Sequence, residues 1–129
     1  MKKIKWELIP TEEPSDCWQR ALTRALGMKR SELKNICKPF INDSGGLVDI
    51  VSEALLLKNG YTRMDAEYRV EEVINFMDSK HNDIVISTAD HIFYVSNDTI
   101  YDNVTDYSKA FFLNETTKTI YYRVKGEML

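Results

Sequence analysis

The spacing of apolar residues along this chain changes once, near residue 80, and that change limits the folds open to it. Before it, apolar residues recur every three or four positions, as in amphipathic helices. After it, short β-branched and aromatic runs are separated by turn residues, as in strands. Helices followed by strands predict an α+β fold, in which N-terminal helices pack on a C-terminal antiparallel sheet.

The best-marked helix is expected at Cys17–Leu26, because Ser15-Asp16 supply N-cap chemistry and Gly27 fits a C-terminal stop. The other expected helices are Ser31–Lys38, Leu47–Lys58 and Val70–Ser79. The expected strands are an edge strand at Lys3–Ile9, a short strand at Tyr61–Met64, and Ile84–Ser87, His91–Ser96, Thr99–Asn103 and Thr119–Val124. No repeat, linker or low-complexity segment interrupts the pattern, so we expect a single domain over residues 1–129.

Composition and charge exclude several classes of protein. The 129 residues are 43% apolar and 29% charged, which is typical of a folded globular chain and not of a disordered one. The formal net charge of −3 argues against a nucleic-acid binder, which needs a basic surface. One local group of basic residues, interpreted as a solvated helix face, comprises Arg20, Arg24, Lys29 and Arg30.

Nothing in the sequence predicts export or membrane insertion. The apolar stretch Ile4–Ile9 is short and is interrupted by Lys5 and Glu7, unlike the core of a signal peptide. No run approaches the roughly 20 apolar residues of a membrane-spanning helix. We therefore expect a cytoplasmic protein whose two cysteines, Cys17 and Cys37, are free thiols.

Cys17 is the first candidate for chemistry, because it directly follows the expected N-cap of the first long helix. A helix N-terminus offers unpaired N–H groups and a favourable dipole, which stabilise a thiolate. The same N–H groups can hold an oxyanion during acyl transfer. Position alone leaves a second interpretation open, in which Cys17 is a small core residue.

His91 and Asp102 are brought together if Asn97-Asp98 forms a two-residue hairpin turn. In that register Phe93 faces Asp102, and His91 lies diagonal to Asp102 on the same sheet face. Diagonal neighbours are about 7–8 Å apart at the backbone, within reach of these two side chains. Since Phe93, Val95 and Ile100 share this face, we expect it to be the buried face that packs on the helices.

These three residues predict a catalytic triad. His91 would deprotonate Cys17 and later protonate the leaving group, and Asp102 would fix the imidazole tautomer and stabilise the imidazolium. The alternatives stay open from the residues alone: His91 as a core histidine bonded to a backbone carbonyl, and Asp102 as a residue at the edge of a turn.

Two segments resemble a known family. Asp16-Cys17-Trp18-Gln19-Arg20-Ala21-Leu22 resembles the Asp-Cys-x-x-Arg-Ala-Leu/Ile opening of small papain-like cysteine-peptidase-fold proteins of phages and bacteria. The run from His91 to Asp102 resembles their C-terminal signature, and bacteriocin-processing cysteine peptidases are more distantly similar. The resemblance implies a papain-like fold, a phage-type origin, Cys17 as nucleophile, His91 as base and Asp102 as the residue that orients it.

Two functions follow as hypotheses. The first is a thiol hydrolase that cuts a peptide, isopeptide or related amide bond, with a protein or peptide substrate and no cofactor. The second is a catalytically inert module of the same fold that binds a host protein, for example a defence enzyme.

A zinc site built from Cys17, Cys37, His81 and His91 is a weaker alternative, because the sequence has no Cys-x-x-Cys or His-x₃₋₅-His spacing. We therefore expect no metal.

Overall fold

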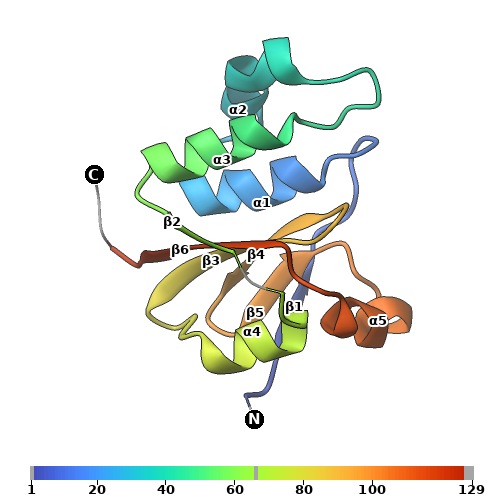
Figure 1. The fold of residues 1–129 in the computed structure, drawn as a ribbon. Coiled ribbons are helices and arrows are strands. Elements are labelled where there is room, and N and C mark those ends of the chain that lie inside the picture. Colours follow the sequence, from blue (N-terminus) through green and yellow to red (C-terminus); the bar gives the residue numbers. More distant parts are fainter. Residues whose placement is uncertain (1, 66, 127–129) are drawn as a thin grey trace.

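A six-stranded sheet lies between two helical layers in the computed structural model, which describes residues 2–65 and 67–126 (Figure 1). The helices are α1 (Cys17–Leu26), α2 (Arg30–Cys37), α3 (Asp49–Lys58), α4 (Val70–Phe76) and α5 (Lys109–Asn114), with 3₁₀ turns at Lys38–Phe40 and Asp106–Ser108. The strands are β1 (Lys5–Leu8), β2 (Thr62–Asp65), β3 (Asn82–Ser87), β4 (Ile92–Ser96), β5 (Thr99–Asp102) and β6 (Thr119–Val124). The predicted α+β class is confirmed.

The sheet is mixed, with the strand order β1-β5-β4-β3-β6-β2. Strands β2 to β6 pair antiparallel, but β1 runs parallel to β5. The backbone N–H of Lys5 donates to the carbonyl of Asp98 at 2.8 Å, and that of Ile9 to the carbonyl of Asp102 at 2.9 Å. The C-terminal strands thus pair antiparallel as expected, and the predicted edge strand joins them in parallel, which makes the whole sheet mixed. Parallel pairing is open to β1 because the chain between β1 and β5 is long enough for a crossover.

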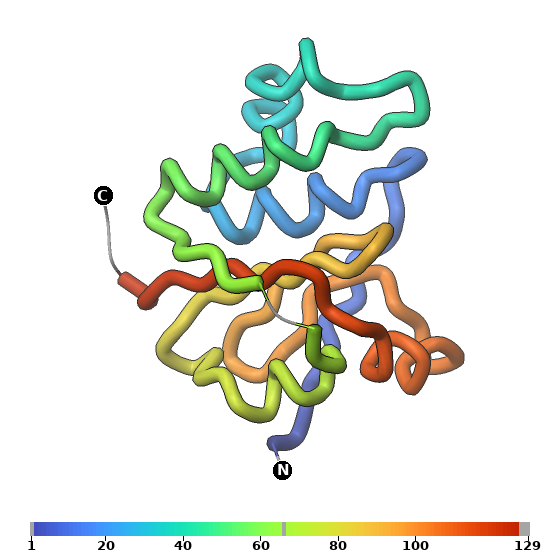
Figure 2. The backbone as a smooth tube through the Cα atoms, in the orientation of Figure 1, coloured from blue at the N-terminus to red at the C-terminus, as the bar shows by residue number. Residues whose placement is uncertain are grey.

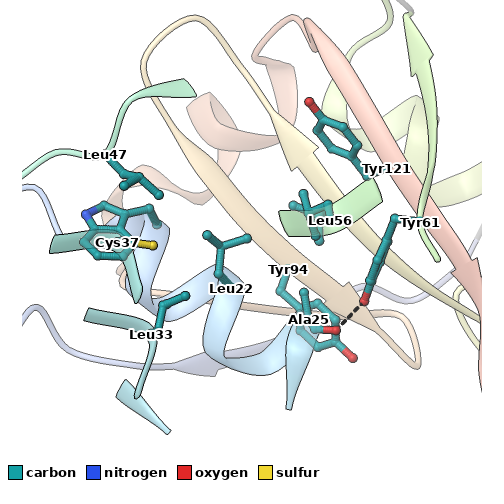
Figure 3. Close-up of a cluster of buried hydrophobic side chains, with 11 residues drawn as sticks. Leu22, Ala25, Leu33, Cys37, Leu47, Leu56, Tyr61, Tyr94 and Tyr121 are labelled. Atoms are coloured by element: carbon teal, nitrogen blue, oxygen red, sulfur yellow. Dashed lines mark hydrogen bonds between the residues drawn. The ribbon is translucent and has the colours of Figure 1, made fainter. Parts of the chain in front are cut away.

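One face of the sheet is covered by α1, α2 and α3. Leu22 and Ala25 of α1 and Leu56 of α3 pack on Tyr94 and Tyr121 of the sheet (Figure 3). Cys37 is fully buried in the same cluster and has no contact with solvent. This packing holds α1 in place on the sheet. The position of Cys17, the first residue of α1, is set by the same contacts.

The opposite face is covered by α4 and α5 (Figure 1). Phe93, Val95 and Ile100 pack there against Val70 of α4, with Phe112 of α5 at the edge of the cluster. The alternation of side chains correctly grouped these three strand residues on one buried face. This face packs on helices, as expected, but on α4 and α5; α1, which carries Cys17, packs on the other face.

The predicted hairpin between β4 and β5 is confirmed. Ser96 pairs with Thr99, and Asn97 and Asp98 both have positive φ angles, 52° and 57°, as a type I′ turn requires. The turn is held by Ser79, which is fully buried and donates from Oγ to Asp98 Oδ1 at 2.7 Å. Ser79 was predicted to end the fourth helix, but α4 stops at Phe76, so Ser79 lies in the connection that supports the turn.

Within the described ranges, none of the helices combines the length and apolar character that crossing a bilayer requires. Figure 2 follows the chain from β1 to the helical layer of α1, α2 and α3, and the segment before Cys17 connects the two.

Gly45 supports the loop that precedes Cys17. Its φ is +93°, and a Cβ on it would lie 2.5 Å from the carbonyl oxygen of Pro14. Trp18 Nε1 also donates to the Gly45 carbonyl at 2.9 Å.

We expect Gly45→Ala to lower the free energy of unfolding in urea by about 3 kcal/mol, from backbone strain plus the backbone clash. Gly27→Ala is the control: φ is +65° with no atom within 4 Å, so the expected loss is about 1 kcal/mol. Equal losses in the two variants would contradict the clash.

Candidate active site

Cys17 is the first residue of α1, and the helix end beneath it is uncapped. Asp16 occupies the N-cap position, but its carboxylate points back along the chain and accepts hydrogen bonds from the backbone N–H groups of Glu12 (2.9 Å) and Glu13 (3.3 Å). Within the part of the chain that the structure describes, the backbone N–H groups of Cys17 and Trp18 therefore have no acceptor. The positive end of the α1 dipole therefore lies at the Cys17 thiol.

The side chain of His91 and the backbone N–H of Ile92 lie close enough to the sulfur of Cys17 to lower its pKa. Burial alone favours the neutral thiol, but the hydrogen bond and positive charge of His91, together with the Ile92 N–H, lower the pKa of Cys17 below its ordinary value. Cys17 is half-buried and lines an open cleft. This combination is typical of a reactive thiol and not of an inert one.

His91 lies just before β4, between Cys17 and Asp102. Its Nε2 is 2.6 Å from Asp102 Oδ2. Its ring is stacked on Phe93 at 6.1 Å between centroids and meets the edge of Phe112 at 6.0 Å. Burial favours the neutral ring, but the hydrogen bonds with Asp102 and Cys17 outweigh burial and raise the pKa of His91 to about 9.

The two pKa shifts have opposite directions, and together they favour an ion pair between a thiolate and an imidazolium near neutral pH. Since Nε2 of His91 is engaged by Asp102, Nδ1 is the ring nitrogen left to face the sulfur. The pair can therefore supply a nucleophile and a proton donor without any prior proton transfer.

An open cleft of about 500 Å³ begins at Cys17 and His91 and passes between α3 and the strand ends. A second cavity of about 410 Å³ is lined by His91 and Asp102, together with Phe93 and Phe112. His91 thus forms part of the wall between the two. The buried floor of the cleft comprises Trp18, Leu47, Ser52, Thr88, Thr119 and Tyr121, and charged side chains at its walls are Asp49, Glu53, Arg63, Asp90 and Lys118.

The structure brings the three predicted residues, Cys17, His91 and Asp102, into one chain of contacts. Their catalytic roles stay predictions. The four residues of the zinc alternative are not assembled: among the described residues, no three His, Cys, Asp or Glu side chains are placed to hold a metal ion. Cys37 lies in the core, where burial raises its pKa, and His81 lies in an exposed loop beside Asp78, at 2.6 Å.

Sequence reasoning missed Arg20, which was assigned to a solvated basic face. Arg20 is 3% exposed and forms ion pairs with Asp16 and with Asp102, the latter from Nε to Oδ1 at 3.4 Å. The assignment is therefore wrong for this residue, whereas Arg24 is exposed as expected. A usable signal was present, because Asp16 and Arg20 have the i,i+4 spacing of a helical ion pair. The link to Asp102 is non-local and left no local signal.

Comparisons of this chain with protein-family models, with curated proteins and with solved structures give no match. The function therefore has to be inferred from the residues of the site and their contacts.

Proposed function

We propose that this chain is a papain-like thiol hydrolase that cleaves an amide bond in a peptide or protein, with Cys17 as nucleophile. The observation that carries the proposal is the continuous contact from the Cys17 sulfur through the His91 imidazole to the Asp102 carboxylate, at the mouth of an open cleft. A core cysteine or a core histidine needs neither the carboxylate nor the cleft.

The proposed reaction begins with attack of the Cys17 thiolate on the substrate carbonyl, which forms a carbon–sulfur bond and an oxyanion. The free backbone N–H groups of Cys17 and Trp18 would stabilise that oxyanion. The His91 imidazolium then gives its proton to the amine nitrogen as the carbon–nitrogen bond breaks. Water attacks the thioester, His91 takes its proton, and the acid product leaves with the thiolate restored.

The size and lining of the cleft favour a polypeptide segment over a small amide. Its volume of about 500 Å³ lies within the range of sites that enclose a drug-sized molecule or a few residues of chain. Leu47 and Tyr121 give it an apolar floor, while Ser52, Thr88 and Thr119 offer hydroxyl groups. Such a mixture suits an extended backbone with apolar side chains.

The chain order of the site supports the papain-like assignment as a proposal. The nucleophile starts a helix on one face of the sheet, and the histidine and aspartate follow from adjacent antiparallel strands. The resemblance of both signature segments to phage and bacterial proteins supports a phage-encoded protein that acts in the host cytoplasm.

The test is a proteome-derived peptide library incubated with the wild-type protein and with Cys17→Ser. The hydrolase proposal expects cleavage products that appear only with the wild type, together with a thioester adduct of Cys17 trapped by rapid acid quenching. Thermal unfolding should be nearly the same for the two proteins. An inert binding module expects no products from either. Products formed equally by both proteins would reject Cys17 as nucleophile.

A further inference from the structure

We propose that Arg20 is a positioning residue of this site, which ties Asp102 to the segment that carries the nucleophile and so sets the alignment of thiol, imidazole and carboxylate. Arg20 lies one turn into α1, on the same helix as Cys17. Asp102 ends β5, on the other side of the imidazole. Arg20 is therefore the direct side-chain link from α1 to Asp102.

The contacts place Arg20 between two buried carboxylates. Its Nη1 binds Asp16 Oδ1, and its Nε lies 3.4 Å from Asp102 Oδ1. The second oxygen of each carboxylate is also used: Asp102 Oδ2 meets His91 Nε2 at 2.6 Å, and Asp16 Oδ2 accepts from Arg30 Nη1 at 3.2 Å. Arg20 thus fixes one oxygen of Asp102, which directs the other oxygen at the imidazole.

The charges show why a cation is required at this place. Asp16, Arg20 and Asp102 are 1%, 3% and 2% exposed, and buried carboxylates without a partner are costly. His91 can neutralise Asp102 from one side only. The guanidinium of Arg20 supplies the remaining positive charge and also acts at a distance to lower the pKa of Cys17.

The geometry favours arginine over lysine. The two hydrogen bonds leave the guanidinium from different nitrogens, Nε toward Asp102 and Nη1 toward Asp16, in a rigid planar arrangement. A lysine ammonium at this position keeps the charge, but as a single point on a flexible chain it does not hold both carboxylates in fixed orientations. Charge and positioning can therefore be separated by substitution.

The test measures the rate of iodoacetamide alkylation of Cys17 from pH 4 to 9, together with the titration of the His91 ring by NMR, in Arg20→Met and Arg20→Lys. For Arg20→Met we expect the midpoint of the alkylation profile to move about one pH unit higher. For Arg20→Lys we expect a smaller upward shift of the midpoint, about half a pH unit.

Arg24→Met is the matched control, since Arg24 lies one turn further along α1 and donates to the Arg20 carbonyl at 3.1 Å without touching either carboxylate. Arg24→Met should leave the pH profile of Cys17 alkylation unchanged. A purely structural role would lower the melting temperature of Arg20→Met but leave the pH profile of its folded form in place, and that outcome overturns the proposal. If Arg20→Met does not fold, an unshifted alkylation profile in Arg20→Lys overturns the proposal.

These measurements read the state of the thiol and do not require a substrate. A shifted profile in a protein that cleaves no peptide would support the role of Arg20 and reject hydrolysis. Cleavage that depends on Cys17, with an unshifted alkylation profile in the Arg20 variants, would support hydrolysis and reject the role of Arg20.

Discussion

Asp102→Asn is expected to slow peptide hydrolysis about 10³–10⁴-fold, if the chain is the hydrolase proposed here. The reason lies in the two neighbours of this carboxylate. His91 Nε2 and Arg20 Nε both face it as donors, one on each oxygen. A carboxamide has only one acceptor, so its NH₂ group must oppose one of the two donors. The substitution therefore breaks either the contact that orients His91 or the contact with Arg20.

Two further readouts identify the cause of the loss. The pKa of His91 should fall from about 9 toward its ordinary value, because the hydrogen bond of Asp102 is the largest influence that raises it. The free energy of unfolding should fall by about 1–3 kcal/mol, the cost of a buried unpaired polar group. Asp106→Asn, at a nearby exposed carboxylate, is the control and should leave all three quantities unchanged. Full activity in Asp102→Asn would remove Asp102 from the proposed triad.

Iodoacetamide is expected to alkylate Cys17 at pH 6 at least about a hundredfold faster than Cys37. A thiol of ordinary pKa near 8.5 is only about 0.3% thiolate at pH 6. The pKa of Cys17 is lowered by His91, whereas that of Cys37 is raised by burial and its side chain is inaccessible. Mass spectrometry of peptides from briefly labelled protein measures both rates in one sample.

His91→Gln should slow the alkylation of Cys17 at pH 6 and so reduce the selectivity, because it removes the imidazolium that stabilises the thiolate while burial still favours the neutral thiol. Hydrolysis and alkylation should separate at alkaline pH. As the pH rises through about 9, His91 loses its proton, so the wild type loses the donor for the leaving amine and its hydrolysis declines. Alkylation needs only the thiolate and should not decline. Equal, slow labelling of both cysteines at pH 6 would contradict the ion pair.

The parts of the site that the sequence predicts are those set by local geometry. The register of β4 and β5 follows from the turn at Asn97 and Asp98, since asparagine and aspartate tolerate positive φ angles. The position of Cys17 follows from the start of an amphipathic helix. With the register known, the parity of the strands is enough to bring His91 to Asp102.

The parts that the sequence does not predict depend on partners distant along the chain. Nothing near Arg20 indicates that its guanidinium is buried, because its second carboxylate lies on β5. The parallel pairing of β1 with β5 and the covering of both sheet faces are likewise set by tertiary packing. The six residues of α5 are too few to produce a helical period, so the apolar partner Phe112 of His91 could not be assigned.

The pairing of the first strand with the fifth has a consequence for synthesis on the ribosome. β1 has no partner until β5 emerges, about 90 residues later, and Asp102 is the last residue of β5. Until then the nascent chain holds a thiol of ordinary reactivity, because neither the imidazole nor its carboxylate has been delivered to it. The pKa of Cys17 is lowered only after folding has brought His91 and β5 to the start of α1.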